Sequence, residues 1–456
     1  MSRVPSVLLL LGALLALGCA SLPQLRVPTW SLRGAAPRVE TADGELSRAE
    51  SARVIEAQDK PGEATVLRRQ VAAMRAINEQ PWVAGNRVRL LVDGPASYRA
   101  TFHAIAAARH NVNIESYIVE GEQVEQKLSQ LLVKKQLEGV QVNLLYDGIG
   151  SLGTSEQFFD SLRATGIHVC EFNPIVPARG VVADPNQRDH RKQVIVDGRI
   201  AVSGGINFSD VYTSGSAGGR DHAPSVKSGW RDTNIELRGP AVEQYQQLFL
   251  QSWQKQNCAP LEPRSYFPRV PAQGNKLVSV VGTSSDDERR RMYLALVAAI
   301  KEARQSVLVT MAYFVPDAEV RDALEDAARR GVDVELILPG FSDSRLVLAA
   351  GRSYYAELLD AGVRIHELRG ALLHAKTAVI DGVWTTVGST NLDWRSLLYN
   401  DELNTVVLGQ SFGQEATVLF DSDLRNTAPI DPKGWEDRGL GPRIEEAFAR
   451  LIARWL

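Results

Sequence analysis

The feature that most constrains the fold of this chain is a long internal repeat. Tyr117 and Tyr313 end equivalent strand patterns and lie 196 positions apart. Gly166 and Gly362 are separated by the same 196 positions, and each ends a helix pattern before a β-branched residue opens the next strand. A glycine after the last helical residue permits such an ending. The repeat therefore predicts two structural halves with the same fold.

Each half alternates helix patterns with nearly continuous apolar strands, which is typical of a largely buried sheet. We predict an α/β fold with two pseudo-twofold-related lobes, each a mixed β-sheet flanked by helices. Helices are also expected at residues 47–57, 63–77 and 442–455. The predicted segments are a signal-like or lipoprotein-like stretch 1–19, a linker with helices 20–84, lobe one 85–260, a linker 261–275, lobe two 276–425 and a C-terminal helical segment 426–456.

The N-terminus departs from globular composition. A short basic start, an apolar run at residues 7–17 and small residues at its end are typical of a secretory signal, and the run is too short to span a membrane. Cys19 follows Ala16-Leu17-Gly18 and resembles the lipidated cysteine of bacterial lipoproteins, so we expect a lipid anchor at the cell envelope, facing the periplasm. A cleaved signal and an uncleaved anchor are the alternatives. Cys170 and Cys258 are compatible with a disulfide or with two buried thiols.

A histidine motif occurs once in each half, at matching places of the repeat. In both copies the lysine follows the histidine by two positions, and an asparagine follows the aspartate by ten. The members are His190, Lys192, Asp197 and Asn207 in the first half, and His374, Lys376, Asp381 and Asn391 in the second. One such motif is weak evidence of function, but two copies with the same spacing are a strong signal.

The spacing has a physical meaning. Residues two apart on a strand point to the same face, so each histidine and lysine project into one pocket. Asp197 and Asp381 each precede a glycine and are expected to form a hairpin turn. The returning strand then brings the asparagine back to the histidine. All members of the two HxKxxxxD motifs are assigned to the catalytic set, within which the two aspartates are expected to shape the turn rather than touch substrate.

These side chains suit a phosphodiester. Lysine and asparagine bind its nonbridging oxygens, a neutral imidazole attacks phosphorus, and an imidazolium protonates the leaving oxygen. Two lysines supply the positive charge that a metal ion otherwise provides, so no metal and no cofactor are expected.

With these residues in place, residues 85–425 resemble the phospholipase D superfamily, whose signature HxKx4Dx6GSxxN occurs twice. The second copy matches fully at Gly388, Ser389 and Asn391, whereas Gly205 replaces the serine in the first. The sequences Ser203-Gly204-Gly205-Ile206-Asn207, Trp230-Arg231-Asp232-Thr233 and Tyr313-Phe314-Val315-Pro316-Asp317 are similar to the bacterial cardiolipin synthase branch.

The resemblance implies a two-step transfer. His190 attacks the phosphate to form a covalent phosphohistidine, and His374 protonates the departing alcohol; the assignment rests on analogy and the reverse stays open. By the same resemblance, Glu402 is expected to orient the histidine of lobe two and Asp232 that of lobe one. The residues implied to hold the phosphate are Lys192, Lys376, Asn207, Asn391 and Ser389.

The resemblance also implies the substrates. Phosphatidylglycerol is the expected donor, phosphatidylglycerol or phosphatidylethanolamine the acceptor, and the membrane surface the place of reaction. A phospholipase D hydrolase that releases phosphatidic acid and a secreted nuclease are the alternatives. The formal net charge of −3 provides no general basic field for nucleic acid, so none is expected as a partner. One chain supplies both half-sites, so we expect a monomer.

Overall fold

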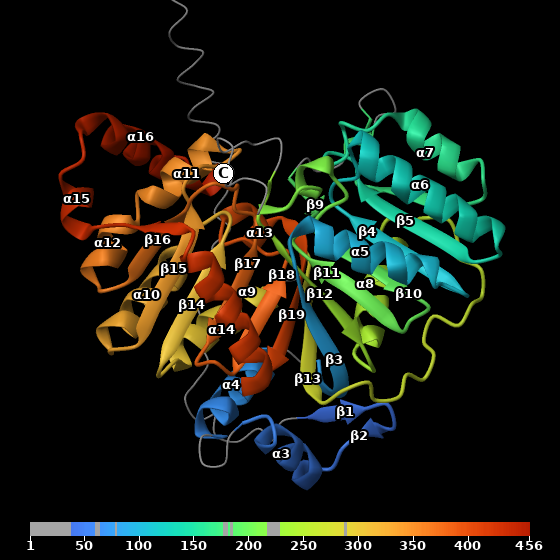
Figure 1. The fold of residues 1–456 in the computed structure, drawn as a ribbon, viewed down its shortest axis with the longest axis horizontal. Helices are drawn as coiled ribbons and strands as arrows, with labels where there is room; N and C mark the ends of the chain where they lie inside the picture. Colours follow the sequence, from blue (N-terminus) through green and yellow to red (C-terminus); the bar gives the residue numbers. More distant parts are fainter. Residues whose placement is uncertain are drawn as a thin grey trace, which may run out of the picture.

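The computed structural model describes residues 38–59, 64–77, 80–176, 181–182, 186–216, 229–286 and 290–456. Figure 1 shows the two halves of the repeat side by side, with helices packed against the strands of each. The segment 1–19 and Cys19 lie outside the described residues.

Hydrogen bonds order the strands of the first half as β6–β5–β4–β10–β11–β12–β3. Strands β4, β5 and β6 are parallel to one another, and the other pairs of this half are antiparallel. The bounds are β3 (Trp82–Val92), β4 (Asn111–Ser116), β5 (Gln141–Asp147), β6 (His168–Phe172), β10 (Lys192–Val196), β11 (Ile200–Gly204) and β12 (Thr233–Arg238).

The second half repeats this order strand for strand, as β16–β15–β14–β17–β18–β19–β13. The predicted pair of pseudo-twofold-related mixed sheets is therefore confirmed. The bounds are β13 (Lys276–Thr283), β14 (Ser306–Met311), β15 (Asp333–Pro339), β16 (Arg364–Leu368), β17 (Lys376–Ile380), β18 (Trp384–Gly388) and β19 (Asn400–Leu408).

The two halves share one hydrogen-bonded sheet, because β3 pairs antiparallel with β13. A register shift between Lys276 and Val278 interrupts this central pair. A short strand β20 (Thr427–Pro429) adds to β16. The lobe boundaries expected from the sequence stay a prediction, since the sheet continues across them.

Helices fill the crossovers between the parallel strands. In the first half these are α5 (Asp93–Ala106), α6 (Glu122–Leu137) and α7 (Glu156–Arg163), with α8 (Val242–Lys255) after β12. The second half has α9 (Arg291–Glu302), α10 (Ala318–Arg329), α11 (Arg345–Arg352), α12 (Tyr355–Asp360), α13 (Trp394–Leu398) and α14 (Gln410–Leu424). The repeated glycines Gly166 and Gly362 follow α7 and α12 with φ angles of 88° and 96°. This left-handed backbone favours glycine, which confirms the predicted helix ends.

The N-terminal segment contains both expected helices, α3 (Arg48–Glu56) and α4 (Ala64–Ile77). Helix α3 begins with a capping box, in which Ser47 and Glu50 exchange hydrogen bonds. A hairpin of β1 (Val39–Thr41) and β2 (Gly44–Glu45), which the sequence did not predict, extends the sheet through β1 and β3. The chain ends with α15 (Pro432–Glu436), α16 (Leu440–Leu451) and a 3-10 turn, Ala453–Trp455. Among the helices described, none has the length and apolar character needed to cross a membrane.

A disulfide resolves the alternative left open for the two later cysteines. Cys170 on β6 is bonded to Cys258, which follows α8, with Cα atoms 5.7 Å apart. The bond ties an edge strand of the first half to the segment that leads into the second.

Candidate active site

The two motif histidines occupy equivalent positions, each two residues before a strand. His190 precedes β10 and His374 precedes β17, and both side chains are buried. The neighbouring strands are β4 and β14, whose C-terminal ends pair with Lys192 and Lys376. Both half-sites therefore lie at the end of the sheet where the parallel strands terminate.

Backbone bonds between the halves bring the two half-sites together. Strand β9 (Arg188–Asp189) pairs with the start of β19, and the His190 amide donates to the carbonyl of Asp401 at 2.8 Å. The reciprocal bond runs from the His374 amide to the carbonyl of Arg231, also at 2.8 Å. Each histidine is thus bonded to the residue that directly precedes an acidic side chain of the opposite half.

The structure pairs each histidine with an acid of the opposite half, which corrects the expected acid–histidine pairs. His190 Nδ1 lies 3.0 Å from Glu402 Oε1, and His374 Nδ1 lies 2.7 Å from Asp232 Oδ2. Glu402 therefore orients the histidine of the first half and Asp232 that of the second, the reverse of the expectation. The reason is the backbone pairing between halves, which places each acid beside the other half's histidine. Both carboxylates are fully buried.

The motif lysines lie beside their own histidines. Lys192 Nζ donates to the carbonyl of His190 at 2.6 Å and lies 5.0 Å from the centre of the Tyr117 ring. Lys376 Nζ lies 3.0 Å from His374 Nδ1. The Tyr117 ring contacts the His190 ring edge-on, with centroids 5.0 Å apart. The tyrosine at the end of the repeated strand is therefore part of the half-site.

Burial sets the protonation of these groups. It lowers the pKa of His190 to about 4, against the opposing effect of Glu402. Burial also lowers the pKa of Lys192 to about 7 and that of Lys376 to about 8. The pKa of His374 is lowered by burial and then by Lys376, with a further contribution from Lys192. Because the histidines respond to the lysines of both halves, the two motifs form one electrostatic site.

Glu402 keeps its charge in this buried setting. Burial by itself would raise its pKa, but the interactions with His190, Lys192 and Ser389 together outweigh it and lower the pKa. The Ser389 hydroxyl donates to Glu402 Oε2. The Ser389 hydroxyl thus holds the acid that orients His190, and its expected role in holding phosphate stays a prediction.

Gly205, the counterpart of Ser389 in the first half, has a different role. A Cβ atom at this position would lie 2.2 Å from Asp232 Oδ1 and 2.6 Å from Oδ2. The carboxylate of Asp232 therefore occupies the space that a serine side chain would need. The departure from the family signature at Gly205 matches the position of the acid that reaches His374.

The two asparagines differ in their contacts. Asn207 Oδ1 accepts from the Ile118 amide at 3.2 Å, and its Nδ2 lies 3.4 Å from the Tyr212 hydroxyl. Asn391 is buried, and its Oδ1 has no hydrogen-bond partner among the described residues. Their role in binding phosphate stays a prediction.

Asp197 and Asp381 lie away from the histidines, at the opposite ends of β10 and β17. The intervening strand of five residues spans roughly 16 Å. The Asp197 carboxylate accepts the amides at the start of β4, including that of His110 at 2.7 Å. Asp381 does the same for the amides that lead into β14. Both adopt positive φ, as the predicted Asp-Gly turns require. The expected turn-shaping role is confirmed, and their place in the catalytic set stays a prediction, since neither carboxylate contacts a histidine in the described residues.

Two aromatic residues at the site were missed from the sequence. The Tyr212 hydroxyl lies 3.2 Å from His374 Nδ1, and the Trp230 and His374 ring centroids are 5.2 Å apart. Both residues flank an insertion that has no counterpart in the second half, so the repeat gave no signal for them. They make the surroundings of His374 unlike those of His190.

Within the residues that the structure describes, no group of three or more His, Cys, Asp or Glu side chains is arranged to hold a metal ion. The charged groups beside the histidines are instead the two lysines and two carboxylates described above.

The family model for the cardiolipin synthase, PLD-like domain matches residues 101–222 and 296–424. The chain is 33% identical over 380 residues to a cardiolipin synthase of Geobacillus thermodenitrificans, covering 83% of this chain and 74% of that protein. It is 35% identical over 386 residues to cardiolipin synthase A of Pseudomonas aeruginosa, covering 84% and 76%.

The crystal structure of a phosphatidylserine synthase from Haemophilus influenzae has the same fold. The TM-score is 0.63 at 12% sequence identity, covering 85% of this chain and 98% of that one. The matched family model and the long alignments at more than 30% identity establish that the chain belongs to the cardiolipin synthase family of phospholipase D-like phosphatidyltransferases.

Proposed function

We propose that this enzyme joins two phospholipids through a covalent phosphohistidine, with phosphatidylglycerol as donor. The observation that carries the proposal is the crossed pair of histidines, each held at Nδ1 by a buried carboxylate of the opposite half. A carboxylate at Nδ1 fixes the tautomer and leaves Nε2 as the reacting nitrogen.

In the first step Nε2 of His190 attacks phosphorus, and the bond from phosphorus to the leaving glycerol oxygen breaks. His374 gives its proton to that oxygen, so glycerol leaves neutral. The low pKa of His190, about 4, supports its role as nucleophile because the ring is neutral at physiological pH. Lys192 and Lys376 are placed to balance the charge of the phosphate oxygens.

In the second step a hydroxyl of the acceptor lipid gives its proton to His374 and attacks phosphorus. The bond between phosphorus and His190 then breaks, which restores both histidines and releases the diphosphatidyl product. Phosphatidylglycerol as acceptor gives cardiolipin. Water in place of the acceptor gives phosphatidic acid, so the outcome depends on which hydroxyl reaches the phosphohistidine.

We further propose that the enzyme works at the membrane surface of the bacterial envelope, anchored through a lipid on Cys19 and facing the periplasm. The disulfide between Cys170 and Cys258 supports an oxidising compartment. Mass analysis of the protein from membranes tests the anchor. An unmodified Cys19→Ser variant is expected to hold to the membrane more weakly than the wild type, and an unlipidated wild-type Cys19 refutes this part.

The chemistry is tested with phosphatidylglycerol and with an analogue that carries a nitrophenol leaving group. His374→Ala should retain the first step on the analogue, because nitrophenolate leaves without a proton, and should accumulate a phosphate adduct on His190. His190→Ala should form no adduct with either substrate. An adduct on His374 reverses the assignment of the histidines, and turnover with no adduct on either histidine refutes the covalent mechanism.

Product analysis by mass tests the transfer itself. Cardiolipin from the wild type and from neither variant is the expected result. Phosphatidic acid alone would make the protein a hydrolase, and activity confined to nucleic acid would exclude the lipid reaction.

A further inference from the structure

The C-terminal helix α16 turns its apolar side outward. Its outward side chains, which we call the apolar face, keep between 49% and 78% of their surface exposed. Such a run of exposed large side chains along one helix is uncommon on a soluble protein and indicates an interaction site. The apolar face consists of Leu440, Ile444, Phe448 and Leu451 of α16, together with Trp455 of the 3-10 turn that follows it.

Three charged residues of the same segment are paired with the rest of the protein. Glu445 is paired with Arg345 of α11 at 2.6 Å. Arg450 is paired with Glu357 at 2.6 Å. Glu446 is buried and accepts from a neighbouring arginine. The helix is therefore held by ion pairs on its inner side, and of its charged residues only Arg443 is exposed, fewer than a solvent-facing helix normally carries.

Helix α16 lies at the same end of the molecule as β9, the strand that directly precedes His190 (Figure 1). Helix α11, on which α16 packs, follows the C-terminal end of β15. The connection before α11 contains Asp343, which accepts from the Tyr313 hydroxyl at 2.7 Å. The Tyr313 ring is in turn 6.3 Å from the His374 ring, between centroids. Only a few contacts separate the helix from the second half-site.

The first half also has an exposed apolar residue at the end of the molecule where the histidines lie. Leu152, in the connection after β5, is largely exposed. Its neighbour Ser151 donates to the carbonyl of Tyr117, the tyrosine that touches His190. Apolar side chains thus project from both halves at the end where substrate must enter.

We propose that this end docks onto a phospholipid bilayer, with the apolar face of α16 inserted among the headgroups and the upper acyl chains. The inference rests on the proposed function, because both lipid substrates lie in a membrane. An interfacial helix needs a broad apolar side, and a terminal tryptophan is favourable at the headgroup level. The exposed Arg443 on the outer side suits an anionic lipid such as phosphatidylglycerol.

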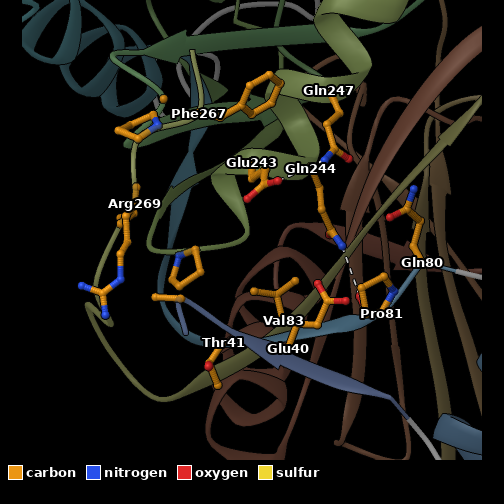
Figure 2. A pocket seen from close by; sticks show the side chains of 15 residues that line it. Glu40, Thr41, Gln80, Pro81, Val83, Glu243, Gln244, Gln247, Phe267 and Arg269 are labelled. Carbon is orange, nitrogen blue, oxygen red and sulfur yellow. Dashed lines mark hydrogen bonds between the residues drawn. The ribbon is translucent and has the colours of Figure 1, made fainter. Parts of the chain in front are cut away.

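Docking in this orientation directs the histidine end of the sheet toward the bilayer. The opposite end, at the bottom of Figure 1 where β1 lies, then faces away from the bilayer. Residues of β1 line a polar cavity of about 500 Å³ there, together with Glu243, Phe267 and Arg269 (Figure 2). Phe267 is 49% exposed, as is Trp455, so it serves as a matched reporter on the far side.

Hydroxyl-radical footprinting of the full chain tests the docking directly, with and without vesicles of phosphatidylglycerol and phosphatidylethanolamine. Vesicles should protect Phe448 and Trp455 from oxidation and leave Phe267 unchanged. If vesicle binding leaves the oxidation of Phe448 and Trp455 as unchanged as that of Phe267, the proposal is overturned. Protection of Phe448 that grows with protein concentration in the absence of vesicles would also overturn it, since a second copy would then cover the face.

A second measurement separates docking from catalysis. The double variant Phe448→Ser with Leu451→Ser should weaken vesicle binding and raise the apparent KM on vesicles, each on the order of tenfold to a hundredfold. Its kcat/KM on a water-soluble short-chain phosphatidylglycerol should equal that of the wild type. Leu137→Ser, at the far end of α6 and 77% exposed, is the matched control and should change neither. A wild type inactive on both forms of substrate counts against the proposed function, and footprinting still decides the docking.

Discussion

Replacing Gly205 by alanine tests the site more sharply than removing a catalytic group. The new Cβ would lie 2.2 Å from one carboxylate oxygen of Asp232, whereas ordinary contacts begin at 3.4 Å. Asp232 cannot move freely, because its two oxygens are bonded to the Thr233 amide and to His374 Nδ1, both at 2.7 Å. Clearing the clash requires a displacement of about 1 Å, and a misplacement of that size costs about 100-fold in rate.

We therefore expect Gly205→Ala to lower kcat on short-chain phosphatidylglycerol by about 100-fold, with the loss acting through His374 of the opposite half. Crowding should also lower the free energy of unfolding by about 1–3 kcal/mol, measured by urea denaturation. Gly439→Ala is the control, because nothing lies within 4 Å of a Cβ there.

The double variant Gly205→Ala with Asp232→Asn identifies the cause of the loss. If Gly205 acts only through Asp232, the double variant should be no slower than Asp232→Asn alone. Wild-type kcat in Gly205→Ala, or additive losses in the double variant, would refute the reasoning that this glycine exists to admit the Asp232 carboxylate.

Three further outcomes follow from the buried charges and the disulfide. Lys192 has a folded pKa of about 7 against an ordinary 10.5, so its burial destabilises the protein at and below pH 7, and this destabilisation decreases only as pH rises above 7. Lys192→Met should therefore abolish activity yet raise the free energy of unfolding at pH 7 by about 2–4 kcal/mol, and an unchanged urea midpoint would contradict this. The value of kcat/KM should fall as pH rises toward 8, because the general acid His374, whose pKa burial lowers, loses its proton, and Lys192 and Lys376, with pKa values of about 7 and 8, follow; on the acid side it should not fall until pH approaches about 4, the pKa of His190, and a pH–rate profile with an acid limb near 6.5 would count against it. Reduction of the Cys170–Cys258 bond, which spans 88 positions, should lower the free energy of unfolding by about 4–5 kcal/mol and leave kcat unchanged, and a parallel loss of kcat would show that the bond shapes the site.

The tertiary structure corrected the sequence where distant segments meet. The motifs indicated that Asp232 and Glu402 belong near histidines, but not that each acid crosses to the other half. That exchange depends on two backbone bonds, from His190 to Asp401 and from His374 to Arg231. Such pairing between segments more than 140 residues apart leaves no local pattern. The hydroxyl of Ser389 is a similar case, because its target Glu402 is set by the register of β18 and β19.

The sequence by itself determined the two-half architecture, the strand that follows each histidine and the turns at Asp197 and Asp381. These depend on periodicity, on glycine conformation and on residues a few positions apart, which local rules describe well. Only the tertiary structure decided which carboxylate serves which histidine, that Tyr212 and Trp230 surround His374, and that α16 faces outward. Those properties depend on burial and on contacts between halves, which exist only once the sheet through β3 and β13 has formed.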